Sequence, residues 1–306
     1  AADAEAAHEE AAHAEAAHAD AAHIDCGVAE AAAARGAEVA VGGSAADALV
    51  AFQLPGVGAA IALQVPTSDL AARPALHGEV LWGSGVVLAC WLATSEAAVS
   101  RRVLEVGSGL GLGGLAAAAC GASAVCLTDR PGPVLDRLRH NARLNAKCGR
   151  AARVSAHALD WTVGYFEGHG LAGGPCAAAG SFDLVLGADV LYDASAPQSL
   201  LRILQTYVGD AGSVALVDPG RGGGSRAALR DALRRAGGWQ YEERPLRDAV
   251  ALAAGLSCER VPVPPVHRRR LAAALGAHAC TVARHGRVRL EDVVSADAPY
   301  TLILAA

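Results

Sequence analysis

The chain has 306 residues, of which 53% are apolar, 19% charged and 4% aromatic, and its formal net charge is −5. This length allows one or two domains with a core that needs no disulfide or metal, and the composition excludes collagen-like and wholly disordered proteins. The best apolar run, residues 85–93, is far shorter than the roughly 20 residues of a membrane-spanning helix, and no secretory signal is visible.

Residues 1–47 form a low-complexity segment with ten acidic residues and one arginine. His8, His13, His18 and His23 are five residues apart, so on an α-helix they would not share the common face that a metal site needs. We expect a disordered or frayed-helical tail without metal. The rest of the chain carries a net charge of +4, too little for a nucleic-acid groove.

From about residue 48, short β-branched runs alternate with stretches rich in alanine, leucine and arginine. This alternation predicts an α/β fold, a largely parallel sheet with helices on both faces. Strands are expected at 102–106, 124–128, 152–156, 182–187, 213–217, 239–243 and 300–304, and helices at 110–120, 133–146, 196–207 and 225–236.

Two segments fit this pattern less well. Residues 50–76 predict an N-terminal strand or hairpin ahead of the core. Residues 245–295 are rich in proline and arginine, and they are long for an internal loop. We expect an insertion with its own helix, unless a flanking strand is misplaced. The HRRR run at 267–270 either binds an acidic partner or forms a solvated surface.

The eight cysteines are scattered along the chain, and no CxxC pair occurs. Zinc ribbons need paired ligands at short spacing, and disulfide frameworks are typical of smaller secreted chains. Buried, reduced thiols are therefore expected, which favours a reducing, cytoplasmic location.

The strongest local signal is the glycine loop that follows the first core strand. Gly107 and Gly109 permit positive φ and bring backbone N–H groups close to a ligand. Asp129 closes the next strand, where its carboxylate suits two ribose hydroxyls. Glu105, two residues before the first glycine, is a feature of S-adenosylmethionine pockets. A dinucleotide fingerprint over residues 109–114, or a purely structural turn, remains an alternative.

Five stretches resemble, in order, the seven-β-strand (class I) protein-lysine methyltransferases, whose members act on chaperones, valosin-containing protein, elongation factors and an electron-transfer flavoprotein subunit. They are GEVLWGSGVVLACWL (78–92), VLEVGSGLGLGGL (103–115), GASAVCLTDR (121–130), HNARLN (140–145) with LDW (159–161), and FDLVLGADVLYD (182–193). The resemblance implies a class I methyltransferase domain over residues 48–306, S-adenosyl-L-methionine as cofactor, and a lysine of a partner protein as acceptor.

The resemblance also implies roles for individual residues. Trp82 would line the methionine end of the cofactor, and its aromatic face would attract the sulfonium. Asp129 would hold the ribose and Trp161 would flank the adenine. Asp160, at the end of the third strand, is placed to accept from the adenine amino group. The remaining cofactor-binding candidates are those of the first strand, the glycine loop and the fourth strand: Glu105, Gly107, Ser108, Gly109 and Ala188.

Asp189 and Tyr192 form the family-specific Asp-x-x-Tyr at the end of the fourth strand, and they are the catalytic candidates. Methyl transfer to an amine mainly requires an uncharged nitrogen positioned about 3 Å from the methyl, without a metal. Asp189 would orient the lysine ammonium, and Tyr192 would narrow the channel and contact the amine. Alternatively, Asp189 caps the following helix.

The turn Asp218-Pro-Gly-Arg221 resembles that of the flavoprotein-directed members, although a merely turn-forming role remains open. It lacks the aromatic residue of an Asn-Pro-Pro-Tyr loop, which disfavours methylation of nucleic-acid bases.

Three other functions remain as alternatives. The same fold would also methylate a small molecule or another protein side chain. A non-catalytic module would bind partners through the acidic tail and the HRRR run, and a nicotinamide-dependent reductase would bind NADH instead. The expected partner is a protein substrate, with no nucleic acid or membrane, and the expected state is a monomer.

Overall fold

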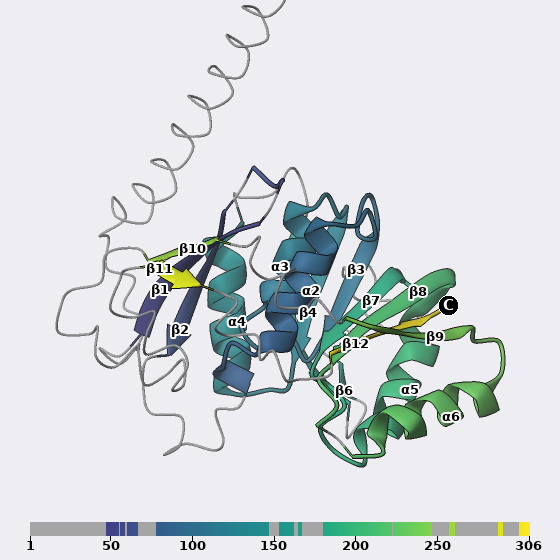
Figure 1. Cartoon of the computed structure of the whole chain (residues 1–306). Coiled ribbons are helices and arrows are strands. Elements are labelled where there is room, and N and C mark those ends of the chain that lie inside the picture. The colour runs from purple at the N-terminus through teal and green to yellow at the C-terminus, as the bar shows by residue number, and fades with distance from the viewer. Residues whose placement is uncertain are drawn as a thin grey trace, which may run out of the picture. The chain divides into compact units, whose positions relative to one another are not determined.

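The computed structural model, shown in Figure 1, describes eleven stretches of the chain: residues 47–54, 56–58, 60–66, 78–146, 153–161, 165–166, 180–221, 223–246, 257–260, 287–289 and 300–306. All of them belong to one of the two units into which the chain divides, Ala45–Ala306. The predictions for the tail up to residue 46 and for the HRRR run lie outside the described residues.

The central sheet contains all seven predicted strands and confirms the α/β fold expected from the resemblance. Five strands run parallel, and β12 is antiparallel to both of its neighbours. The two-residue β6 extends one edge. The order across the sheet is β6 (Tyr165–Phe166), β5 (Arg153–Asp160), β4 (Ala124–Asp129), β3 (Arg102–Val106), β7 (Phe182–Ala188), β8 (Val208–Asp218), β12 (Thr301–Ala305) and β9 (Tyr241–Pro245).

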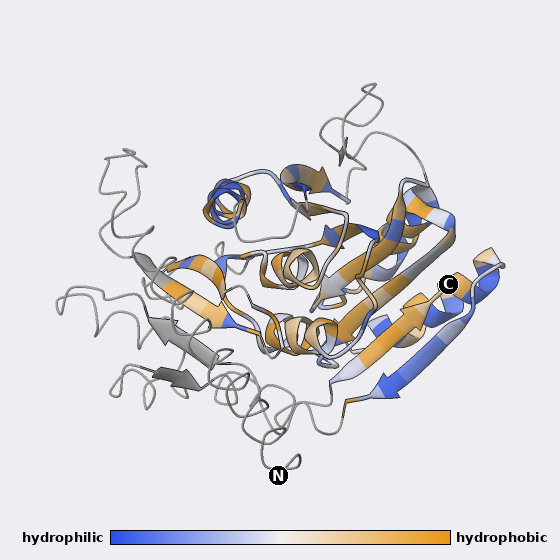
Figure 2. Ribbon diagram, turned by 90° about the horizontal axis from the view of Figure 1, so that it is seen from above, coloured by the Kyte–Doolittle hydropathy of each residue, from blue (hydrophilic) through white to orange (hydrophobic). Residues whose placement is uncertain are grey.

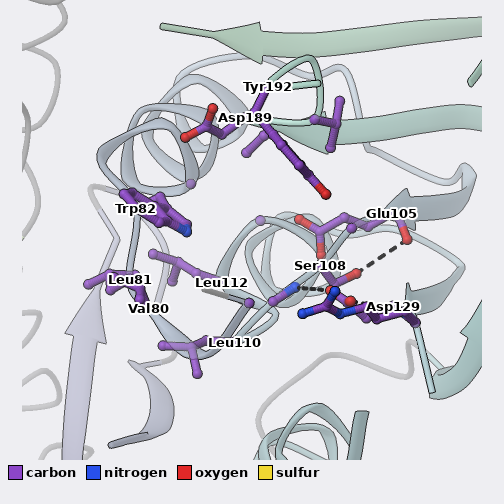
Figure 3. Close-up of a pocket in the computed structure, with 18 of the residues that line it drawn as sticks. Val80, Leu81, Trp82, Glu105, Ser108, Leu110, Leu112, Asp129, Asp189 and Tyr192 are labelled. Carbon is purple, nitrogen blue, oxygen red and sulfur yellow. Dashed lines mark hydrogen bonds between the residues drawn. The ribbon is translucent and has the colours of Figure 1, made fainter. Parts of the chain in front are cut away.

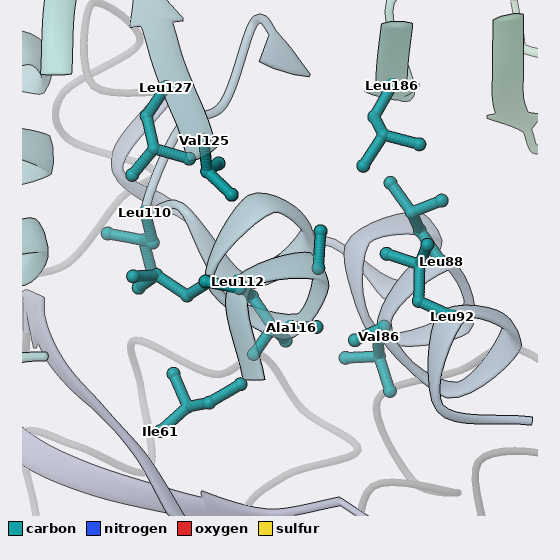
Figure 4. Close-up of a cluster of buried hydrophobic side chains, with 14 of the residues drawn as sticks. Ile61, Val86, Leu88, Leu92, Leu110, Leu112, Ala116, Val125, Leu127 and Leu186 are labelled. Atoms are coloured by element: carbon teal, nitrogen blue, oxygen red, sulfur yellow. The ribbon is translucent and has the colours of Figure 1, made fainter. Parts of the chain in front are cut away.

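Helices cover both faces of this sheet (Figure 1). One face packs against α2 (Gly83–Ala93), α3 (Leu112–Ala119) and α4 (Pro133–Leu144), and the other against α5 (Ala196–Tyr207) and α6 (Ser225–Ala236). Because side chains alternate along a strand, Leu184 and Leu186 of β7 join the first core, whereas Val185 joins the second. Figure 4 shows part of the first core, in which Leu88 of α2 and Leu112 of α3 belong to one buried cluster.

One helix is absent from the predictions, and several element boundaries differ from them. Helix α2 was not predicted, because it is buried on every side from Val86 to Cys90 and shows no polar face. Helix α3 begins at Leu112 rather than at residue 110, because Gly111 has a φ of +89° and is its N-cap. Strand β8 begins at Val208, directly after α5, through a glycine-containing stretch with weak strand propensity.

The predicted N-terminal hairpin is confirmed by β1 (Asp47–Gln53) and β2 (Ala60–Pro66), which pair antiparallel. They form a second sheet with β10 (Ser257–Arg260) and β11 (Arg287–Arg289), in the order β11-β10-β1-β2. The 245–295 insertion therefore returns to the N-terminal hairpin. Its described residues form strands, and the expected helix is not among them.

Two asparagines of the 140–145 stretch join the second sheet to α4. Asn145 accepts a hydrogen bond of 2.9 Å from the Ala62 N–H and donates one of 2.6 Å to its carbonyl. Asn141 accepts from the Gln64 N–H at 2.8 Å and donates to the Leu110 carbonyl at 3.0 Å. These side chains satisfy backbone groups along β2, at the edge of its sheet, and at the end of the glycine loop.

Charge protects the free edge at β9. Figure 2 shows this strand in blue beside the apolar β12, because Glu242, Glu243 and Arg244 follow one another in it. Charged side chains discourage pairing with other chains at such an edge. None of the described helices has the length and hydropathy that crossing a bilayer demands.

The expectation of wholly reduced thiols is wrong at one position. Cys126, buried in β4, is disulfide-bonded. Cys90 and Cys120 are free, and burial raises the pKa of their thiols to about 12 and about 11. Cysteine usage in this chain therefore does not support the inferred reducing compartment.

Candidate functional site

A pocket of about 460 Å³ opens where the parallel strands end. This is the edge at which open α/β sheets bind ligands, and the volume suits a small organic molecule. Figure 3 shows its walls. Ten of the eleven residues singled out from the sequence line it: Trp82, Glu105, Gly107, Ser108, Gly109, Asp129, Trp161, Ala188, Asp189 and Tyr192. The exception is Asp160, which ends β5 but does not line the pocket.

The glycine loop is tied to the neighbouring strand β4. Gly107 and Gly109 have φ values of +62° and +54°, as the sequence predicts for a sharp turn. The Ser108 N–H donates to the Thr128 carbonyl at 2.8 Å, and Ser108 Oγ accepts from the Thr128 N–H at 3.0 Å. A Cβ at Gly109 would lie 2.8 Å from the Gly78 carbonyl oxygen. The loop is thus held in one shape, and only glycine fits at residue 109.

The Asp129 carboxylate is fixed at the end of β4 by two backbone groups. Its Oδ2 accepts from the Gly109 N–H and its Oδ1 from the Arg130 N–H, both at 2.8 Å. Burial raises the pKa of Asp129 above its usual value, and these two hydrogen bonds oppose that rise. Each carboxylate oxygen has a second acceptor site, so this group suits hydroxyl donors of a sugar.

Glu105 is a buried carboxyl beneath the pocket. It is 2% exposed, and among the described residues its Oε2 has no hydrogen-bond partner. Burial raises the pKa of Glu105 to about 7, against the opposing effects of Ser108 and of the Gly114 N–H. A buried acceptor without a donor is costly unless a ligand supplies one. The residue therefore points to a ligand that carries a donor or a positive charge.

Helix α2 begins at the pocket. Its N-cap is Trp82, without a side-chain cap, and Gly85 of the first turn lines the cavity. A Cβ at Gly85 would meet nothing within 4 Å, so the space beside the turn is open. An uncapped helix N-terminus presents backbone N–H groups and a positive dipole, which favours an anionic group of a ligand.

Asp189 follows β7 and has a φ of +59°, an uncommon value for a residue with a side chain. Its N–H donates to the Val217 carbonyl at 2.9 Å, which fixes the backbone. Helix α5 has Ser195 as N-cap, with no side-chain cap bond, and Asp193 Oδ1 accepts the Ser195 N–H at 2.7 Å. The alternative that Asp189 caps the following helix is therefore wrong.

The carboxylate of Asp189 instead pairs with Arg221. Arg221 Nε donates to Asp189 Oδ1 at 3.3 Å, and a terminal nitrogen donates to Oδ2. The same guanidinium lies over the Trp82 ring, 4.3 Å from its centroid. One arginine therefore joins Trp82 of the α2 start to Asp189 of the β7 end across the pocket.

Tyr192 lines the mouth of the pocket and is 62% exposed. In Figure 3 its phenol extends into the pocket from the side of Asp189. Partial desolvation raises the pKa of Tyr192, so the phenol keeps its proton at neutral pH.

Arg221 also lines the pocket, although the sequence predicts only a turn for residues 218–221. The available signal is an arginine three residues after β8, a strand that ends at this edge of the sheet. Arg226 braces that turn by donating to Asp218 Oδ2 at 2.7 Å. The 78–92 stretch is likewise anchored, because buried Glu79 accepts from Arg137 Nε of α4 at 2.8 Å.

No cluster of three or more metal-ligating side chains occurs in the part of the chain that the structure describes. The chemistry of the described pocket is that of carboxylates, aromatic rings and backbone N–H groups.

The sequence that forms this pocket is similar to that of known proteins. Residues 73–221 match a family model described as lysine methyltransferase. The chain is 36% identical over 127 residues to Protein N-lysine methyltransferase METTL21A of Danio rerio, covering 41% of this chain and 53% of that protein. It is 30% identical over 151 residues to Protein N-terminal and lysine N-methyltransferase efm7 of Aspergillus fumigatus, covering 46% and 56%.

The chain thus spans about half the length of these curated relatives. Among solved structures, P. horikoshii TYW2 in complex with MeSAdo is similar with a TM-score of 0.44 and 12% identity, covering 86% of this chain and 72% of that one.

Proposed function

We propose that the protein transfers a methyl group from S-adenosylmethionine to a lysine side chain of a partner protein, and the match of residues 73–221 to a family model described as lysine methyltransferase supports this proposal. The observation that carries the proposal is the pocket, which brings together Asp129, Glu105, Trp82 and Asp189 from four separate segments.

The residues of the pocket fit this cofactor. Asp129, fixed by two backbone N–H groups, would accept from the ribose hydroxyls. Apolar side chains, among them Leu159 and Trp161, line the wall where an adenine would pack. The buried Glu105 Oε2, which has no partner among the described residues, would accept from a cationic ammonium. The uncapped start of α2 would hold a carboxylate.

When bound, S-adenosylmethionine would supply a methyl group on a sulfonium sulfur. An acceptor amine that has lost its proton to solvent would attack this carbon in line, and the S–CH3 bond would break to leave a neutral thioether. The chain's own residues position the acceptor. Asp189 would attract a lysine ammonium by its charge and aim it into the pocket, and the protonated Tyr192 would narrow the entrance. The Trp82 face favours positive charge in the same place.

The exposure of the entrance favours a protein acceptor over a metabolite. Tyr192 is 62% exposed and the Arg221 side chain 47% exposed, so the catalytic end of the pocket lies at the surface. A side chain that projects from a folded protein can enter a site of this kind. The family match also favours a lysine, because both relatives described above are named as lysine methyltransferases of proteins.

Two measurements test the proposal. Calorimetry should show binding of S-adenosylmethionine to the full chain and none of NADH. Labelled methyl donor, added with the protein to a cell extract, should label a protein band whose modified residue is lysine. Absence of donor binding would refute the enzyme, and binding of NADH instead would favour a reductase. If the label appeared only in small molecules, the methyltransferase activity would be supported, but the proposal that the acceptor is a protein would be refuted.

A further inference from the structure

The position that the proposed acceptor would use is already filled by a cation of the chain itself. The Arg221 guanidinium stacks on the Trp82 ring at 4.3 Å and pairs with both carboxylate oxygens of Asp189. An aromatic face and a carboxylate are the two partners that favour a positively charged side chain. A lysine ammonium that enters from the exposed end of the pocket needs the same partners.

The two members of this ion pair differ in burial. The Asp189 side chain is 6% exposed, whereas that of Arg221 is 47% exposed. A buried carboxylate that loses its cation is strongly destabilised. A half-exposed guanidinium, in contrast, regains hydration when it turns toward solvent, and exposed ion pairs contribute little. Asp189 therefore stays paired only if another cation, such as a lysine ammonium, takes the place of the Arg221 guanidinium.

The backbone supports such an exchange. The Asp189 backbone is fixed by its N–H bond to Val217, and its side chain is only 6% exposed, so the carboxylate has little room to move. Arg221 is the last residue of a turn that Arg226 braces through Asp218, so the turn remains when the Arg221 side chain moves. Only the long arginine side chain has to change its rotamer.

Building on the proposed function, we propose that Arg221 is an internal competitor for the acceptor and thereby determines its specificity. The guanidinium holds the pocket closed to neutral groups, because a neutral molecule that displaced it would leave Asp189 buried without a cation. An alkylammonium replaces it without that penalty. The site thus selects a cationic amine, and Arg221 lowers the apparent affinity for every acceptor by the fraction of time that it fills the site.

The test uses n-butylammonium as a probe of the lysine side chain, with binding to the full chain measured by NMR titration in the absence of methyl donor. We expect Arg221→Gln to bind butylammonium at least about tenfold more tightly than the wild type, as the removal of a competitor predicts. Ethylguanidinium should compete with butylammonium in this variant. The double variant Asp189→Asn/Arg221→Gln should lose the gain.

Arg102→Gln is the matched control, because Arg102 also pairs with an aspartate, Asp183, at 3.1 Å, but at the opposite ends of the strands. Its affinity for butylammonium should equal that of the wild type. Equal binding by the wild type and Arg221→Gln would overturn the proposal, as would a gain that persists in the double variant.

If Arg221→Gln does not fold, Arg221→Lys provides the second variant. Its ammonium keeps a charge for Asp189 but lacks the planar group that stacks on Trp82. We expect a smaller gain in butylammonium affinity, and no gain would overturn the proposal. Because these measurements need neither donor nor transfer, their failure leaves the proposed methyltransferase intact. If, conversely, the protein did not bind S-adenosylmethionine, the proposed function would fail, and competition by Arg221 for the acceptor site would not explain that result.

Discussion

The Oδ2 atom of Asp129 accepts a hydrogen bond of 2.8 Å from the backbone N–H of Gly109, twenty residues earlier in the chain. This bond joins the end of β4 to the glycine loop and sets the carboxylate at the pocket wall before any ligand binds. Preorganisation of this kind lowers the cost of ordering the site on binding.

Asp129→Ala should therefore weaken binding of S-adenosylmethionine by about 1–3 kcal/mol, the usual cost of losing hydrogen bonds to a charged group. Calorimetry with the purified variant measures the change. Asp136→Ala, at an exposed position of α4, is the control and should bind as the wild type does. Unchanged affinity of Asp129→Ala would place the ribose elsewhere.

Asp189→Asn should abolish methyl transfer while leaving donor affinity nearly unchanged. Asparagine is the suitable variant because it tolerates positive φ, as residue 189 requires, and because it keeps the shape of aspartate while an NH2 group replaces one oxygen and the charge is lost. The neutral amide cannot attract the acceptor ammonium. Transfer is measured with labelled donor and the identified acceptor, and donor binding by calorimetry. Transfer at the wild-type rate would contradict the role assigned to Asp189.

The buried Glu105 should make stability depend on pH. Burial raises its pKa from 4.5 to about 7, so between these values the folded chain holds a proton that the unfolded chain releases. The free energy of unfolding therefore falls as pH rises through this range. Glu105→Gln has no carboxyl to titrate, so its free energy of unfolding does not fall for this reason. The difference in free energy of unfolding, variant minus wild type, should therefore increase by up to about 3 kcal/mol between pH 4.5 and pH 8.

Urea denaturation of both proteins at pH 4.5, 6 and 8 measures this difference, in which contributions from other titrating groups cancel. A difference between Glu105→Gln and the wild type that does not vary with pH would show that the carboxyl titrates at its ordinary value.

Gly113→Ala should destabilise the chain, because the new Cβ would lie 2.3 Å from Glu105 Oε1 and 2.8 Å from Leu88 Cδ2. Overpacking of this kind costs about 1–3 kcal/mol. Gly85→Ala is the control for stability, since its Cβ would meet nothing within 4 Å and alanine favours helix. Thermal unfolding compares the two variants, and equal melting temperatures would mean that α3 shifts at little cost.

Asn145→Ala should loosen the second sheet from α4. Both backbone groups of Ala62 would lose their buried partner, at a cost of about 1–3 kcal/mol for each group left unsatisfied. Hydrogen exchange at Ala62 should accelerate in this variant. Arg143→Ala, at an exposed position of the same helix, should leave that exchange rate unchanged. Unchanged protection of Ala62 in Asn145→Ala would show that the Asn145 side chain does not hold β2 against α4.

The central strands β3, β7 and β8 could be predicted from the sequence because nearly continuous apolar runs between turn residues identify strands buried on both faces. The glycine loop and Asp129 were predictable for a related reason. Both lie next to a strand end, and parallel strands bring their carboxyl ends to one edge of the sheet. Helix α2 was not predictable from periodicity, because a helix buried on all sides has no polar face.

By itself, therefore, the sequence determined the α/β fold and the segments that line the pocket, since local patterns specify strands, turns and their order. Tertiary structure alone decided that Arg221 pairs with Asp189 and stacks on Trp82, three residues that lie far apart in the chain. It also decided that Asp160 stays out of the pocket and that the 245–295 insertion pairs with the N-terminal hairpin. Such contacts depend on how distant elements pack, and no local pattern records them.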